Sequence, residues 1–175
     1  MGVTPKQVSG TTFTARPVST EPALPEGNES LPKQVLPGIR LLFVEDHDAV
    51  RRTVSSMLEI AGAEVTAVHS ATEALEFLQK KPLDIVVTDL GLPDLDGGQL
   101  IARAREFTDI PIVLLSGLSS DTITKCLVGN GKPDAIIPKP MQFQTMAETI
   151  LTQLELYKTR KSRHAESSTL NRMLD

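Results

Sequence analysis

Five polar side chains that could do chemistry each stand at the end of a short apolar run, or directly after one: Glu45, Asp46, Asp89, Ser116 and Lys139. If these runs are neighbouring parallel strands, their carboxyl ends meet at one edge of a sheet. Carboxylates held together repel one another, and a hard cation with oxygen ligands, such as Mg²⁺, relieves that repulsion. An ammonium group and a hydroxyl beside them supply donors for a phosphoryl group. The pattern therefore predicts a Mg²⁺ site next to a phosphoryl site.

The elements that must position these residues follow from the hydrophobic periodicity. From Ile39 onward, apolar runs alternate with segments of helical period, which is typical of repeated β-α units. We expect strands over residues 40–44, 64–68, 85–88, 112–115 and 135–137. We expect helices over residues 48–61, 72–79, 98–107, 121–128 and 142–157. With right-handed crossovers, this alternation predicts an α/β fold with a doubly wound, five-stranded parallel sheet.

The first expected helix carries the clearest signals. Asp48 is a good N-cap candidate, and Gly62 is a typical helix stop. Five apolar residues fall on one face, as in a helix that covers a core: Val50, Val54, Met57, Leu58 and Ala61.

The 175 residues divide into three parts by composition. Residues 1–38 hold six of the 12 prolines and predict a leader without regular structure. Residues 39–157 form the expected domain, and residues 158–175 form a basic tail. Residues 158–164 of this tail could prolong the last helix, and the tail is expected to fray after them. Because so few residues lie outside the domain, we expect no separate output domain within this sequence.

Composition excludes several classes of protein. One cysteine and three scattered histidines do not favour a disulfide framework or a zinc site, and they suggest a reducing, cytoplasmic compartment. No apolar run is long enough for a membrane span. The aromatic share is 3%, and the basic tail is short, so nucleic acid is not an expected partner.

Four motifs, in their order along the chain, carry a resemblance to a known family. They are Phe-Val-Glu45-Asp46, Val-Val-Thr-Asp89-Leu-Gly-Leu-Pro93 with Gly97 following, Leu-Leu-Ser116-Gly, and Lys139-Pro140. Together they resemble the receiver domain of bacterial two-component response regulators, over about residues 39–151. This resemblance implies a flavodoxin-like sheet with the strand order 2-1-3-4-5. The type that fits is the stand-alone receiver.

The resemblance implies a role for each of the residues at the carboxyl edge of the sheet, here called the rim: Glu45, Asp46, Asp89, Ser116 and Lys139. It implies that Asp89 is the phosphoacceptor, and that Asp46, Asp89 and the backbone carbonyl of Gly91 bind Mg²⁺. Glu45 assists the metal through a water. Lys139 pairs with the phosphoryl oxygens, and Ser116 hydrogen-bonds one of them and relays the switch. In this family the peptide bond leading into the proline after the lysine is cis.

The function implied is phosphorylation by a histidine kinase or a histidine phosphotransfer protein, followed by protein contact or onward phosphotransfer. Such a protein is not an enzyme acting on other substrates, because it catalyses only its own phosphorylation and dephosphorylation. One alternative is a phosphatase of the haloacid-dehalogenase type, which needs a second Asp where Gly91 stands. The other is a DNA-binding regulator that uses the basic tail.

Two departures from the family bear on the switch. Ile136 stands where the family usually has an aromatic side chain that swings inward, so Ser116 and the loop after it are expected to carry the change. Gly91 has no side chain to shield an acyl phosphate from water, so a short-lived phosphorylated state is expected.

Overall fold

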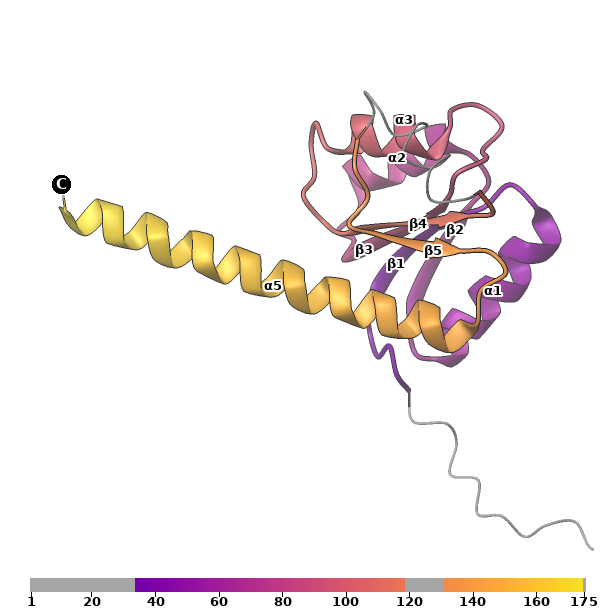
Figure 1. Ribbon diagram of the computed structural model, residues 1–175, viewed down its shortest axis with the longest axis horizontal. Helices are drawn as coiled ribbons and strands as arrows, with labels where there is room; N and C mark the ends of the chain where they lie inside the picture. Colours follow the sequence, from indigo (N-terminus) through magenta and orange to yellow (C-terminus); the bar gives the residue numbers. More distant parts are fainter. Residues whose placement is uncertain (1–33, 119–130, 175) are drawn as a thin grey trace, which may run out of the picture. The chain divides into compact units, whose positions relative to one another are not determined.

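A parallel sheet of five strands forms the centre of the computed structural model, which describes residues 34–118 and 131–174 (Figure 1). The strands are β1 (Arg40–Val44), β2 (Glu64–Val68), β3 (Ile85–Asp89), β4 (Ile112–Ser116) and β5 (Ala135–Pro138). Their order in the sheet is β2-β1-β3-β4-β5, which confirms the predicted flavodoxin-like topology.

Four helices lie in the described part of the chain: α1 (Asp48–Ile60), α2 (Ala71–Lys80), α3 (Gly97–Ala104) and α5 (Phe143–Leu174). Figure 1 shows α1 and α5 on one face of the sheet and α2 and α3 on the other. The fifth helix expected from the sequence, over residues 121–128, lies outside the described residues. No helix in the described ranges combines the length and the hydropathy of a membrane span.

The core lies on both faces of the sheet because successive strand residues point to opposite sides. Phe43, Val87 and Leu115 belong to the cluster that also contains Leu58 of α1 and Ile150 of α5. Leu42, Val86 and Leu114 belong to the second cluster, with residues of α2 and α3. Burial on both sides explains why these strands are apolar throughout, as expected for a parallel sheet covered by helices.

Helix α1 differs from the sequence prediction at its start and on its apolar face. Its N-cap is His47, whose side chain makes no capping hydrogen bond, while Asp48 is the first helical residue and pairs with Arg51. The buried residues of the helix are Ser55 and Leu58. Val50 and Met57 lie on a neighbouring strip of the helix surface and are therefore partly exposed. Only part of the predicted apolar face is therefore buried.

The segment before β1 packs against the domain, although the predicted leader extended to residue 38. Leu36 is fully buried, and its backbone N–H donates to the carbonyl of Ala61 over 2.8 Å. The N–H of Gly38 donates to the carbonyl of Gly62 over 2.9 Å. Gly62 has a φ of 98°, a conformation that favours glycine and ends α1 as predicted. The domain thus includes the last residues of the predicted leader.

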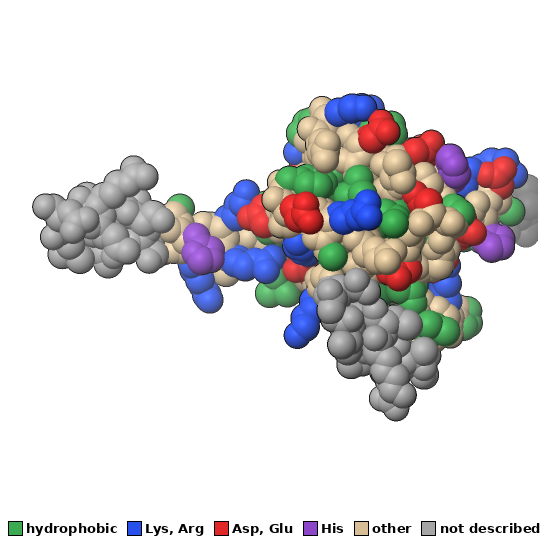
Figure 2. Space-filling model, turned by 90° about the horizontal axis from the view of Figure 1, so that it is seen from above, with side chains coloured by type: hydrophobic (Ala, Val, Ile, Leu, Met, Phe, Trp, Pro, Cys, Tyr) green, Lys and Arg blue, Asp and Glu red, His purple; other side chains and the backbone are tan. Residues whose placement is uncertain are grey.

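Helix α5 continues to Leu174, past Tyr157 and past residues 158–164, over which the sequence allowed the last helix to be prolonged. No Gly or Pro interrupts this stretch, so nothing in the backbone forces the helix to stop. Polar contacts also support it: the Tyr157 hydroxyl donates to Asp109 over 2.9 Å, and Arg160 donates to Asp134 over 3.5 Å. Lys and Arg side chains, blue in Figure 2, gather along this part of the helix.

Candidate functional site

The topology brings the predicted rim residues to one edge of the sheet. Glu45 directly follows β1, Asp89 ends β3, Ser116 ends β4 and Lys139 directly follows β5. The strand order reverses between β1 and β3, and ligands of open α/β sheets bind at such a point, outside the carboxyl ends of the strands.

Lys139 joins two of the carboxylates. Its ammonium Nζ lies 3.0 Å from Oε2 of Glu45 and 3.0 Å from Oδ2 of Asp89. Burial lowers the pKa of Lys139, but hydrogen bonds to Glu45 and Asp89 outweigh it, and the pKa is raised overall. Glu45 is only 1% exposed, so Lys139 rather than water is the partner of this carboxylate oxygen. The amine therefore stays protonated and holds β1, β3 and β5 together at the rim.

Asp89 presents its carboxylate with both oxygens in contact with donors. Oδ1 accepts a hydrogen bond from the backbone N–H of Leu90 over 2.8 Å, and Oδ2 faces Lys139. The Thr88 hydroxyl donates to the backbone carbonyl of Asp89 over 3.0 Å. These contacts fix the carboxylate at the end of β3, where it can meet a phosphoryl group.

Asp46 turns towards His47, a residue to which the sequence analysis gave no role. Nδ1 of His47 lies 3.0 Å from Oδ1 of Asp46. Partial burial raises the pKa of Asp46, but the hydrogen bond and charge of His47 outweigh this effect, so the pKa is lowered. The only sequence signal for His47 was its place directly after the acidic pair.

The donors at this edge fit a divalent cation. One ligand atom from each of Glu45, Asp46 and His47 lies within 4.8 Å of the others. Two of the three are carboxylate oxygens, which suit Mg²⁺. The predicted Asp89 ligand is joined to this group through Lys139 and Glu45.

The loop from β3 to α3 is held close to the site. A Cβ added to Gly97 would lie 2.7 Å from the backbone oxygen of Asp89 and 2.9 Å from Cδ1 of Leu114, so only glycine allows this approach. Asp94, in the same loop, accepts hydrogen bonds from the backbone N–H groups of Ala71 (3.0 Å) and Thr72 (2.8 Å) at the start of α2. Desolvation raises the pKa of Asp94, but these bonds and that of the Thr72 hydroxyl lower it to about 2.

Gly91, whose carbonyl is the fourth predicted metal ligand, lies in the same loop with open space beside it. A Cβ built there meets no atom within 4 Å.

Ser116 is buried at the end of β4 and is joined to Lys139 by a backbone hydrogen bond. Its hydroxyl accepts a hydrogen bond from the N–H of Leu118 over 3.1 Å, and its carbonyl accepts one from the N–H of Lys139 over 2.7 Å. The Lys139–Pro140 peptide bond is cis. Ile136, which replaces the aromatic residue of the family, is 43% exposed on β5.

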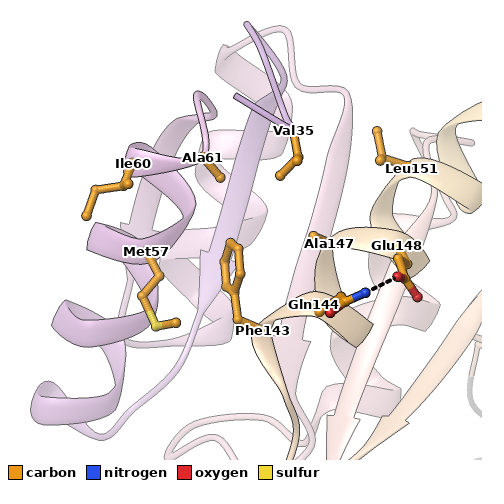
Figure 3. A pocket seen from close by; sticks show the side chains of 9 residues that line it. All are labelled: Val35, Met57, Ile60, Ala61, Phe143, Gln144, Ala147, Glu148 and Leu151. Atoms are coloured by element: carbon orange, nitrogen blue, oxygen red, sulfur yellow. Dashed lines mark hydrogen bonds between the residues drawn. The ribbon is translucent and has the colours of Figure 1, made fainter. Parts of the chain in front are cut away.

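An apolar groove lies between α1 and α5, on the helices that begin beside the rim (Figure 3). Its volume is about 590 Å³. The lining residues come from both helices, the turn after α1 and the segment before β1: Val35, Met57, Ile60, Ala61, Phe143, Gln144, Ala147, Glu148 and Leu151. Met57, which the sequence placed on the apolar face of α1, contributes to this groove.

Comparisons with known proteins agree with this geometry. Residues 41–151 match the family described as the response regulator receiver domain. The sensor protein TorS of Escherichia coli (strain K12) is 34% identical over 125 residues, which make up 69% of this chain and 13% of TorS. The transcriptional regulatory protein KdpE of Staphylococcus aureus is 34% identical over 111 residues, which make up 63% of this chain and 48% of KdpE. The chain thus spans about half or less of the length of these relatives.

Solved structures show the same fold. The CheY-like response regulator receiver domain protein of Methanospirillum hungatei JF-1 superimposes with a TM-score of 0.63 at 25% sequence identity, covering 70% of this chain and 98% of that chain. The receiver domain of the hybrid histidine kinase CckA gives a TM-score of 0.54 at 30% identity and covers 66% of this chain. With its sheet order, its rim residues and these matches, the chain belongs to the family of response regulator receiver domains.

Proposed function

We propose that the chain accepts a phosphoryl group on Asp89 from a phosphohistidine of a histidine kinase or a histidine phosphotransfer protein. The observation that carries this proposal is the position of Lys139, which lies 3.0 Å from both Glu45 and Asp89 at the switch point of the sheet. An ammonium group next to the acceptor carboxylate can neutralise the charge of an arriving phosphoryl group.

In the transfer, an Asp89 carboxylate oxygen attacks phosphorus, the N–P bond of the donor breaks, and the imidazole leaves with the electron pair of that bond. Phosphoryl transfer has a loose transition state, so the protein mainly has to align the two groups and stabilise charge. Lys139 does so from one side. Asp46, Asp89 and the Gly91 carbonyl would hold a Mg²⁺ ion, with Glu45 acting through a water. When bound, this ion would neutralise further charge on the phosphoryl oxygens.

The product, an aspartyl phosphate, carries about 1.5 to 2 negative charges in place of the single charge of the carboxylate, so the rim gains about one negative charge. We propose that the Ser116 hydroxyl then leaves the N–H of Leu118 and hydrogen-bonds a phosphoryl oxygen, drawing the loop after β4 with it. Ile136 has no polar group to exchange between two positions, so the signal would leave through this loop and the surfaces that it touches.

The test is phosphorylation of the purified chain by acetyl phosphate, followed by intact-mass measurement and peptide mapping. We expect a Mg²⁺-dependent phosphorylated species with the modification on the peptide that contains Asp89, and no such species in Asp89→Asn. Equal labelling in excess chelator, or labelling that survives in Asp89→Asn, contradicts the proposal.

The groove between α1 and α5 is the surface on which we propose that the phosphodonor protein docks. It is apolar, and it is formed by the two helices that follow Asp46 and Lys139 in the chain. We expect Ile60→Glu to slow phosphotransfer from phosphorylated histidine phosphotransfer proteins about tenfold or more, because a charge in an apolar interface must be desolvated. Labelling by acetyl phosphate should not change, because Ile60 is 68% exposed and we expect its replacement to leave the fold intact.

Leu156→Glu is the matched control for this prediction. Leu156 is 56% exposed on α5, but it lies with Asp134 and Arg160 in a different cavity. Equal slowing of transfer by both variants would show that an added negative charge slows transfer wherever it lies. The groove would then not be the docking surface.

The alternative of DNA binding by the basic end of α5 has less support. Lys158, Arg160 and Lys161 each lie within 4 Å of a carboxylate of this chain, so part of their charge is already balanced. A steep decrease of DNA affinity with salt would be the observation in its favour.

A further inference from the structure

His47 places an imidazole nitrogen beside the two acidic residues of the rim. Its Nδ1 lies 3.0 Å from Oδ1 of Asp46 and 3.7 Å from Oε1 of Glu45. The side chain is 76% exposed and is not used to cap α1, although His47 occupies the N-cap position. The ring is therefore available to a ligand that binds at the rim.

The two oxygens of Glu45 have different neighbours. Oε2 pairs with Lys139 over 3.0 Å, whereas Oε1 faces His47, whose backbone N–H lies 3.3 Å away. Arg51 steadies this loop, since its Nη1 donates to the backbone carbonyls of Glu45 (2.9 Å) and Asp46 (3.2 Å). One oxygen of Glu45, one of Asp46 and one nitrogen of His47 thus share the same small volume, away from the ammonium group.

The spacing of these atoms suits a shared cation. Two neighbouring ligands at about 2.1 Å from an octahedral metal lie about 3.0 Å apart. The Asp46–His47 pair already has this separation, and the exposed ring can turn to shorten the distance to the cation. Ligation would replace the hydrogen bond between the two side chains with two bonds to the metal.

We propose that His47 is a nitrogen ligand of the rim metal site, which therefore prefers first-row transition-metal dications such as Mn²⁺ and Co²⁺ over Mg²⁺. The proposal rests on the proposed cation-dependent function of this rim. Imidazole suits transition metals, whereas Mg²⁺ prefers oxygen ligands and keeps its waters. Among these metals, affinity should rise from Mn²⁺ to Co²⁺.

The experiment is calorimetric titration of the whole, metal-free chain with Mg²⁺, Mn²⁺ and Co²⁺, for the wild type, His47→Ala and His47→Asn. We expect both variants to lose Co²⁺ affinity tenfold or more, while the Mg²⁺ affinity changes by less than about threefold. Asn can still hydrogen-bond Asp46 but lacks the imidazole, so it separates ligation from loop positioning. His69→Ala is the matched control, because His69 is an exposed histidine that pairs with Glu73 over 3.0 Å.

Pulsed electron paramagnetic resonance of bound Mn²⁺ gives a second readout that does not depend on affinity. The wild type and His69→Ala should show coupling to an imidazole nitrogen, and His47→Ala should not. Wild-type protein without this coupling, or His47 variants with unchanged or higher Co²⁺ affinity, would overturn the proposal. A higher Co²⁺ affinity in the variants would mean that His47 competes with the cation for Asp46.

Phosphorylation by acetyl phosphate in Mg²⁺ separates this inference from the proposed function. If the wild type and His47→Ala are both labelled on Asp89 but the nitrogen coupling is missing, the inference fails and the phosphoacceptor function stands. If the coupling is present but the wild type is not labelled, the metal assignment holds and the phosphoacceptor function fails.

Discussion

Lys139→Met is expected to lower the free energy of unfolding by about 2 to 3 kcal/mol and to slow phosphorylation of Asp89 on the order of 100-fold. Methionine keeps most of the aliphatic stem but removes the charge. Glu45, which is 1% exposed, then loses the ammonium group 3.0 Å away and faces Asp89 without a cation between them. Urea denaturation measures the first effect, and the rate of labelling by acetyl phosphate measures the second.

A double-mutant cycle with Glu45→Gln tests the reason given for the stability loss. If the cost of Lys139→Met comes from the unpaired buried charge of Glu45, the double variant should recover about 1 kcal/mol or more relative to the sum of the single effects. The labelling rate should not recover, because the group that neutralises the phosphoryl charge is still missing. Purely additive free energies would contradict the pairing argument.

Gly97→Ala is expected to destabilise the fold by about 2 kcal/mol and to slow labelling of Asp89 on the order of tenfold. The new Cβ would lie 2.7 Å from the backbone oxygen of Asp89, 2.9 Å from Cδ1 of Leu114 and 3.0 Å from Cα of Leu90. Two of these atoms belong to the backbone, so no side-chain rotation relieves the contact. The start of α3 or the end of β3 must move, and the acceptor carboxylate moves with it.

Gly91→Ala is the control for this variant, because it adds the same methyl group to the same loop. Its Cβ meets no atom within 4 Å, so the free energy of unfolding should change by less than about 0.5 kcal/mol. Equal destabilisation by the two substitutions would show that the close approach at Gly97 does not govern the effect.

Hydrophobic periodicity alone was enough to determine the bounds of the strands to within a residue, and the resemblance to receiver domains supplied their order in the sheet. Strands β1 and β2 match the predicted ranges, and β3, β4 and β5 each extend one residue further. Local sequence carries this information because a buried parallel strand needs a continuous apolar run, and the right-handed crossover leaves few topologies. The helix predicted over residues 121–128 stays a prediction.

The bounds of the helices were harder to predict at positions where tertiary contacts decide them. The sequence placed the last helix over residues 142–157, with residues 158–164 able to prolong it, but α5 continues to Leu174, supported by contacts with Asp109 and Asp134 and by the absence of Gly or Pro. Met57 fits the apolar stripe of α1, yet it lines a groove because the helix turns Ser55 and Leu58 towards the sheet. A helical wheel shows which residues share a face, but not the direction in which the neighbouring element lies.

For the site, the sequence by itself determined which residues reach the rim, since each follows or ends a strand and parallel strands end at one edge. Only the tertiary structure decided how they pair. Lys139 lies between Glu45 and Asp89, and Asp46 turns to His47, although 94 residues separate Lys139 from Glu45 in the chain. Such pairing depends on side-chain distances of a few ångströms between strands, and these are set by the register and twist of the sheet, which no local pattern of residue types encodes.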